Sequence, residues 1–200
     1  IRHRYYDNNG LKTDFNAFLK ATLNAGDKLS LFADMQYRMV SYEFAGLSSE
    51  GEPMPGLDRL DFFNPKAGLT WKFDEQHRLY ASFSMAGKEP SRDDYVETTA
   101  MSRPKPEYLY DIEAGFQYRT AHINANLNYY HMIYKDQLAL TGEVNDVGNY
   151  TRTNIPDSYR EGLEVVVNWQ TTPWFRTQGN VTVSRNKIRE FREYIDDYDN

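Results

Sequence analysis

The feature that most constrains this chain is a regular alternation of apolar and polar residues over long segments. Residues 123–142 read INANLNYYHMIYKDQLALTG. One parity is mostly apolar and the other polar: Ile123, Ala125, Leu127, Tyr129, His131 and Ile133 against Asn124, Asn126, Asn128, Tyr130 and Tyr134. Successive side chains of a strand point to opposite faces, so the pattern predicts a two-faced β-strand. About ten residues is also the length of a tilted membrane-spanning strand.

The same alternation recurs along the chain, whereas the spacing typical of helices is nearly absent. The predicted strands lie near 13–24, 28–43, 66–73, 77–87, 108–119, 122–135, 159–170 and 174–186. Many are longer than the roughly five or six residues of an average strand. We therefore predict an all-β fold, an antiparallel up-and-down meander of about eight long strands.

The connections between the predicted strands alternate between short and long. Short turns are predicted at 25–27, 74–76, 120–121 and 171–173, and long polar connections at 46–64, 88–107 and 136–158. One end of the sheet then has only tight turns, as in outer-membrane barrels. A soluble β-sandwich or a solvent-facing meander also alternates. Strand length, aromatic residues near strand ends and this loop asymmetry favour the barrel.

Composition agrees with a barrel and excludes other classes. Aromatic residues make up 15% of the chain, yet its mean hydropathy is −0.76, as expected where every lipid-facing residue is followed by a lumen-facing one. No stretch approaches the ~18 apolar residues of a membrane helix. The absence of Cys excludes disulfides and thiolate metal sites. A net charge of −6 argues against nucleic-acid binding.

The sequence shows no assembled catalytic or metal-binding motif. The four His residues are scattered, and His131 shares the apolar parity of its strand. Pairing His131 with a Ser would make a barrel enzyme, but an imidazole at the membrane interface is the favoured interpretation. The carboxylates Asp93 and Asp94 lack the spacing and glycine of a calcium-binding loop. We therefore predict that the protein is not an enzyme and needs no cofactor and no metal.

What remains is a binding surface formed by the long connections. Arginine forks suit anionic, oxygen-rich ligands, and tyrosine faces suit flat organic ones, so a chelate or an oligosaccharide would fit. Any one of these residues could equally be an ordinary polar or aromatic loop residue. The candidate ligand-binding residues are Arg92, Tyr95, Arg103, Tyr150, Arg152 and Arg160.

Five ordered segments resemble the late barrel strands of TonB-dependent outer-membrane receptors. They are FFNPKAGLTWKF (62–73), LYASFSMAGKEPSRDDYVE (79–97), PKPEYLYDIEAGFQYR (104–119), NLNYYHMIYKDQLALTG (126–142) and NDVGNYTRTNIPDSYREGLEVVVNW (145–169). The stretch EPSRDDY is similar to receptors from Bacteroidetes-type bacteria. Together the segments cover more than half of the chain.

The resemblance implies a location in the bacterial outer membrane and a fold as part of a 22-stranded transmembrane β-barrel. Residues 1–200 would be a partial barrel domain, lacking the plug domain, the TonB-box and the last strands. The parent receptor would contact outer-membrane lipid, and TonB through the missing N-terminal region. It would import a scarce nutrient with TonB-supplied energy. An iron-siderophore, haem or corrinoid ligand is favoured over a glycan.

Other interpretations remain open at this point. The chain could be a small structural or adhesive outer-membrane barrel that closes by pairing its first strand with its eighth. It could also belong to a carbohydrate-importing receptor of the same family. A fragment of a larger barrel would expose two unpaired edges and an apolar face, so we expect the isolated chain to self-associate through its sheet edges.

Overall fold

The computed structural model describes residues 7–47, 53–54, 56–96, 103–144 and 150–191. Eight strands and one short helix make up this part of the chain. They are β1 (Asp7–Ala25), β2 (Leu29–Leu47), β3 (Leu57–Lys72), β4 (His77–Lys88), α1 (Arg92–Val96), β5 (Glu107–Arg119), β6 (Ile123–Val144), β7 (Tyr150–Thr172) and β8 (Phe175–Ile188). No helix among these residues is long and apolar enough to cross a membrane.

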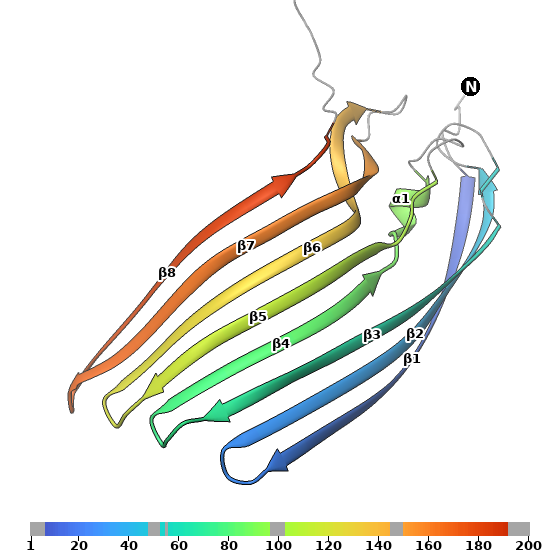
Figure 1. The fold of residues 1–200 in the computed structure, drawn as a ribbon. Helices are drawn as coiled ribbons and strands as arrows, with labels where there is room; N and C mark the ends of the chain where they lie inside the picture. Colours follow the sequence, from blue (N-terminus) through green and yellow to red (C-terminus); the bar gives the residue numbers. More distant parts are fainter. Residues whose placement is uncertain (1–6, 48–52, 55, 97–102, 145–149, 192–200) are drawn as a thin grey trace, which may run out of the picture.

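The strands form a single curved sheet in which each strand pairs with the next in the chain (Figure 1). Every pairing is antiparallel, which confirms the predicted meander. Four tight turns lie at one end, here called the turn end, and the longer connections lie at the other, the loop end. Within the described residues β1 and β8 are the two edges, so the sheet is open.

The strands are longer at the loop end than the sequence predicts. β2 continues to Leu47 and β3 begins at Leu57, so much of the predicted connection 46–64 is strand. The predicted connection 136–158 is also wrong for most of its length, because the β6–β7 ladder continues to Leu140 opposite Arg152. An antiparallel hairpin pairs its own backbone groups and can therefore project into water. The connection between Lys88 and Glu107 is confirmed.

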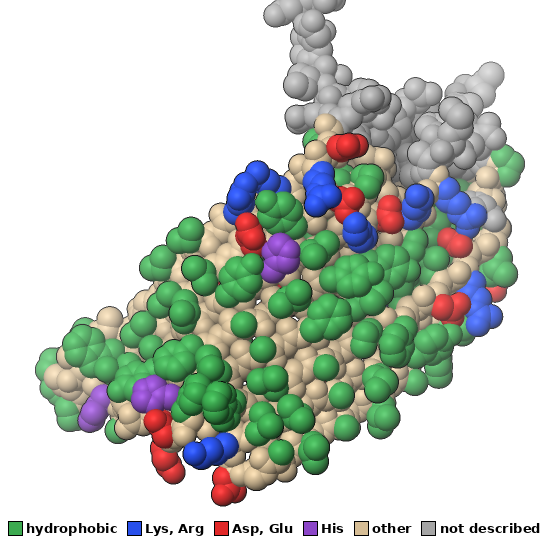
Figure 2. All heavy atoms as spheres, viewed as in Figure 1, with side chains coloured by type: hydrophobic (Ala, Val, Ile, Leu, Met, Phe, Trp, Pro, Cys, Tyr) green, Lys and Arg blue, Asp and Glu red, His purple; other side chains and the backbone are tan. Residues whose placement is uncertain are grey.

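The two faces of the sheet differ in polarity. The face of Leu31, Leu69, Leu127 and Val165, called the apolar face, exposes large hydrophobic side chains. Figure 2 shows these side chains spread over its middle, while charged side chains gather near its two ends. Aromatic rings line its turn end, including Trp71 with Phe73 and His77 with Tyr118, as predicted for a membrane interface.

On the opposite, polar face, three aromatic rings lie over glycines directly opposite them on the neighbouring strand, and the Phe62 ring on β3 also lies against Gly87 on β4. Phe32 is directly opposite Gly68, Tyr80 opposite Gly115, and Tyr130 opposite Gly162. A Cβ at these glycines would lie 2.5 Å, 2.2 Å and 2.6 Å from the nearest ring or hydroxyl atom. The Tyr80 hydroxyl also donates to Asn128 Oδ1 at 2.9 Å. A Cβ at these glycines would therefore strike the ring that lies across the strand.

The buried core of the described residues is small and lies at the loop end. It contains Val40, Tyr42, Phe44, Met54, Phe62, Tyr95 and Val96. These side chains come from β2, β3, the segment before β3 and α1, so the core fastens the β4–β5 connection to the sheet.

Candidate binding site at the loop end of the sheet

The β4–β5 connection is held to the polar face by Glu89. Its carboxylate accepts hydrogen bonds from Lys12 Nζ on β1 at 2.7 Å and from the Arg38 guanidinium on β2 at 2.7 and 2.8 Å. Arg38 also donates to Asp14. Burial alone would raise the pKa of Glu89, but the bonds from Arg38 and Lys12 outweigh it and lower the pKa. Glu89 is therefore a buried, charged anchor.

The helix α1 begins with a local capping arrangement. Ser91 Oγ accepts from the Asp94 backbone N–H at 3.2 Å, and Asp94 Oδ2 accepts from the Ser91 backbone N–H at 2.7 Å. Such a reciprocal pair, three residues apart, satisfies backbone donors at a helix start. The other Asp94 oxygen lies 3.3 Å from the Arg152 guanidinium on β7. Asp94 thus joins α1 to the β6–β7 hairpin.

Tyr95 is the aromatic anchor of this segment. It is 4% exposed, and its ring lies 5.6 Å from Tyr42 and 5.0 Å from Phe44. Its hydroxyl donates to Asp58 Oδ2 at 2.5 Å. Burial, together with this bond to a carboxylate, raises the pKa of Tyr95. The hydroxyl is thus held neutral as a donor.

Four of the predicted site residues gather around α1. Arg92 and Tyr95 belong to the helix, and Arg92 donates a hydrogen bond to Asn8 on β1. Arg103 pairs with Asp58 at 2.9 Å, the same carboxylate that accepts from Tyr95. The side chains of Arg92, Arg103 and Arg152 remain 48%, 54% and 47% exposed. Each guanidinium therefore keeps donors available for an anionic ligand.

The other two predicted residues lie on β7. Arg160 is exposed on the strand, with its guanidinium 5.0 Å from the centre of the Tyr134 ring. It is opposite Met132, on the polar face and away from α1. Tyr150 begins β7 opposite Val144, and its side chain lies outside the described structure. The structure thus brings together four of the six residues.

Sequence reasoning missed the carboxylates that organise this site. Asp58, Glu89 and Asp94 fix the arginine and tyrosine side chains, and Asp58 and Glu89 act across distant strands. The Ser91–Asp94 spacing is a local signal that could have identified the start of α1. The roles of Asp58 and Glu89 carry no local signal, because their partners lie far away in the chain.

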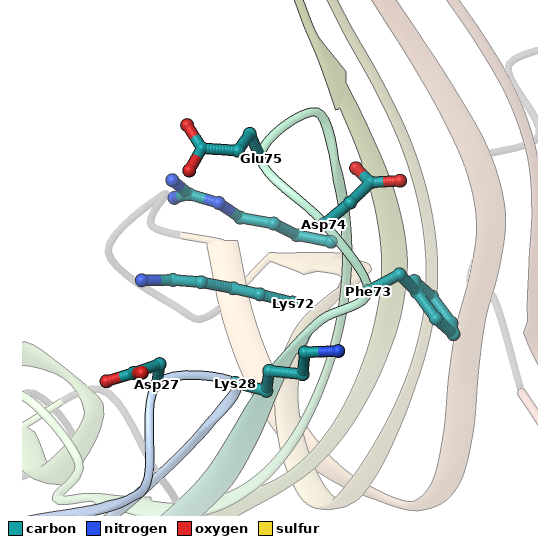
Figure 3. A pocket seen from close by; sticks show the side chains of 7 residues that line it. Asp27, Lys28, Lys72, Phe73, Asp74 and Glu75 are labelled. Atoms are coloured by element: carbon teal, nitrogen blue, oxygen red, sulfur yellow. The ribbon is translucent and has the colours of Figure 1, made fainter.

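A hollow lies at the turn end, with a volume of about 480 Å³. Figure 3 shows Lys72, Asp27 and Glu75 pointing to one side and Phe73 to the other. Lys72 is directly opposite Arg78 across β3 and β4, a pairing of like charges. Carboxylates at Asp27 and Glu75 flank these two cations, so the rim is close to charge balance. It is therefore less suited to an anionic ligand than the loop end.

Comparison with protein families supports the barrel interpretation. Residues 2–200 match a family model described as TonB dependent receptor-like, beta-barrel. No curated protein sequence matches the chain.

Solved structures share the fold at low sequence identity. The copper transporter OprC gives a TM-score of 0.77 at 16% identity, over 90% of this chain and 29% of its own. The FrpB iron transporter from Neisseria meningitidis gives 0.69 at 21%, over 91% and 27%. The siderophore receptor PiuA from Acinetobacter baumannii gives 0.75 at 15%, over 95% and 28%. The chain therefore spans less than a third of each of these structures.

Proposed function

Since the chain belongs to the TonB-dependent receptor β-barrel family, we propose that it forms part of a receptor importing a scarce nutrient with TonB-supplied energy. Members of this family reside in the outer membrane of Gram-negative bacteria, and they are transport receptors rather than enzymes. The observation that carries the proposal is the two-faced sheet with elaborate connections at one end only. The short turns then face the periplasm and the loop end faces outward.

The two faces of the sheet have separate roles in this proposal. The apolar face lies against lipid, since its exposed Leu, Val and aromatic side chains have no cover in the sheet. The polar face, with Asn126, Asn128 and Tyr80, lines the lumen. A 22-stranded barrel with a separate plug domain would supply the other walls of the lumen and its closure.

The proposed ligand is an anionic metal chelate, in the class of iron-siderophores, haem or corrinoids. The structural neighbours include a copper transporter, iron transporters and a siderophore receptor. The half-exposed guanidinium groups of Arg92, Arg103 and Arg152 offer paired donors to carboxylate or catecholate oxygens. A carbohydrate would gain less binding energy from three neighbouring cations than an anionic chelate would.

An uptake experiment tests the proposed function. The gene for the whole receptor is deleted, and uptake of labelled ferric siderophores, haem and corrinoid is measured under nutrient limitation. We expect uptake of one ligand to be lost, restored by the intact gene, and lost again when TonB is absent. Unchanged uptake of every ligand would overturn the proposal.

The role of the loop-end arginines has its own test in the complete receptor. Arg103→Gln and Arg152→Gln are each expected to weaken binding of the transported chelate by roughly tenfold, as for loss of a charge-assisted hydrogen bond. Arg176→Gln is the matched control, because it removes the same group at the turn end, where Arg176 donates to Gln170. If Arg103→Gln and Arg152→Gln bind the chelate as tightly as the Arg176→Gln control, these two arginines do not belong to the ligand site.

An eight-stranded structural or adhesive barrel receives no support from the sheet. Such a barrel would need β1 to pair with β8. In the described residues β1 pairs only with β2, and β8 only with β7.

A further inference from the structure

Two of the exposed arginines at the loop end are already paired with carboxylates of the protein itself. Arg152 on β7 lies 3.3 Å from Asp94 of α1, and Arg103 lies 2.9 Å from Asp58 on β3. Each carboxylate thus uses a guanidinium that an anionic ligand would also use. A guanidinium that holds one anion attracts a second one less, because the first partner offsets its charge and repels the newcomer. The protein therefore competes with its ligand at these arginines.

The two carboxylates differ in what they lose when an anion takes their arginine. Asp58 still accepts the hydrogen bond from the Tyr95 hydroxyl at 2.5 Å, so the loss of Arg103 leaves it paired. One oxygen of Asp94 caps the start of α1, whereas Oδ1 has Arg152 as its only partner among the described residues. The Asp94 side chain is 6% exposed, so water cannot replace this partner while α1 stays in place.

Arg92, the third arginine of the site, has no such competitor. Its guanidinium donates to a neutral side-chain amide oxygen on β1, and its acidic neighbour Asp93 is 4.0 Å away and 76% exposed. An exposed pair of this length contributes little. Arg92 is therefore open to an anion in this structure, whereas Arg152 can offer its full charge only when Asp94 is displaced.

We propose that Asp94 is an internal competitor that sets how much negative charge a ligand must carry to engage Arg152. A polyanion can contact Arg92 and Arg103 with some of its oxygens and displace Asp94 with others, whereas a monoanion has no charge left for the exchange. Because the exchange would leave a buried carboxylate unpaired, α1 must loosen from the β6–β7 hairpin when it occurs. This role rests on the proposed anion site, and it makes Asp94 a specificity-determining residue.

The direction of an affinity change tests this role in the complete receptor, purified in mild detergent. Inorganic pyrophosphate is the polyanionic probe, and calorimetric titration at constant ionic strength measures its binding. Asp94→Asn keeps the side-chain oxygen but removes the competing charge, so it should bind pyrophosphate about fivefold more tightly, the effect of one partly exposed ion pair. A purely structural carboxylate would lower the affinity or leave it unchanged when replaced, and either result would overturn the proposal.

Two further variants keep the result specific. Asp93→Asn is the matched control, since it removes the same charge from the neighbouring residue of α1 but frees no closely held arginine. It should change the affinity less than about twofold, and a gain equal to that of Asp94→Asn would overturn the proposal. In an Arg152→Gln background, Asp94→Asn should give no gain, because the two residues act as one pair. A full gain in that background would also contradict it.

Hydrogen exchange in the unsubstituted receptor tests the same role without a variant. Saturating pyrophosphate should accelerate exchange of the Asp94 and Tyr95 amides about fivefold, because the ligand breaks the ion pair that holds α1. Acetate at the same ionic strength carries a single charge and should leave their exchange unchanged. Unchanged exchange in pyrophosphate, or equal acceleration in acetate, would overturn the proposal. The uptake experiment can still identify an imported nutrient in that case, so the two failures are distinguishable.

Discussion

At the scale of single residues, the polar face is shaped by aromatic rings that lie across glycines. Tyr80 illustrates the arrangement, since its ring crosses Gly115 on β5 and its hydroxyl reaches Asn128 on β6. One side chain thus ties three strands together. Among the described residues the buried hydrophobic cluster lies at the loop end, so contacts of this kind fix the relative position of the strands elsewhere on the polar face.

A methyl group added at Gly115 should displace the Tyr80 ring from its position over β5. We expect Gly115→Ala to lower the stability of the receptor by about 1–3 kcal/mol, the usual range for overpacking. Thermal unfolding in detergent measures the effect. Gly179→Ala is the control, because a Cβ there meets nothing within 4 Å in the described structure. If Tyr80→Ala fails to relieve the cost of Gly115→Ala, the ring contact is not its cause.

The Glu89 anchor predicts that the β4–β5 connection loosens in acid. A carboxyl whose pKa is lowered on folding stabilises the folded state above its unfolded pKa, near 4.5. This contribution is lost as the pH falls through the lowered value. Pepsin digestion should therefore cut the connection faster as the pH falls below about 4.

A variant separates this effect from general acid denaturation. Glu89→Gln should be cut faster than wild type at about pH 4, where Glu89 is still ionised, and the difference should fade at lower pH. Glu75→Gln, on the exposed turn between β3 and β4, should behave as wild type. Equal cleavage of wild type and Glu89→Gln at about pH 4 would show that the anchor does not hold the connection.

At the scale of elements, the membrane-spanning parts of the strands were predictable, whereas their extensions were not. Leu127 and Asn128 face opposite sides as their parity requires, and the tight turns lie close to the predicted positions. The segment around Asn154 and Pro156 has turn-forming residues and no alternation, so sequence alone predicted a connection. Hydrogen bonds from that segment to residues elsewhere in the chain hold it in a strand.

Asn154 is the residue that secures this extension. Its side-chain amide donates to Lys105 O and Asp136 O, and its Oδ1 accepts from the Lys105 backbone N–H at 2.8 Å. Asn154→Ala leaves these backbone groups without that partner, at a cost of about 1–3 kcal/mol. Hydrogen exchange at Leu138 and Leu140 should accelerate. Asn180→Ala on β8 is the control, and equal exchange in both variants would contradict this role.

The loop-end site was predictable in its residue types and not in its architecture. Four of the six predicted residues meet around α1, but sequence could not show that Tyr95 is buried or that Asp58 serves two of them. Those contacts join β3 to a connection far away in the chain. The alternation of residues in the sequence predicts which face of a strand each side chain occupies. It does not predict which distant residues come into contact, because those contacts depend on the folded sheet.

At the scale of the whole molecule, the open sheet presents two unpaired edges and an uncovered apolar face. Isolated residues 1–200 should therefore self-associate in detergent-free buffer, with edges pairing between copies. Size-exclusion chromatography with light scattering would show oligomers or aggregates. Detergent should reduce association through the apolar face. A monodisperse monomer without detergent would contradict this expectation.

The pairing of rings with glycines also bears on how such sheets change in width. Phe32–Gly68, Tyr80–Gly115 and Tyr130–Gly162 each lie within one hairpin closed at the loop end, and the three glycines follow at equal intervals along the chain. A hairpin gained or lost as a unit therefore carries its own ring and its own glycine. At these three pairs strand number can change by two without leaving the ring facing a residue that it would strike, whereas Phe62 on β3 lies against Gly87 of the next hairpin.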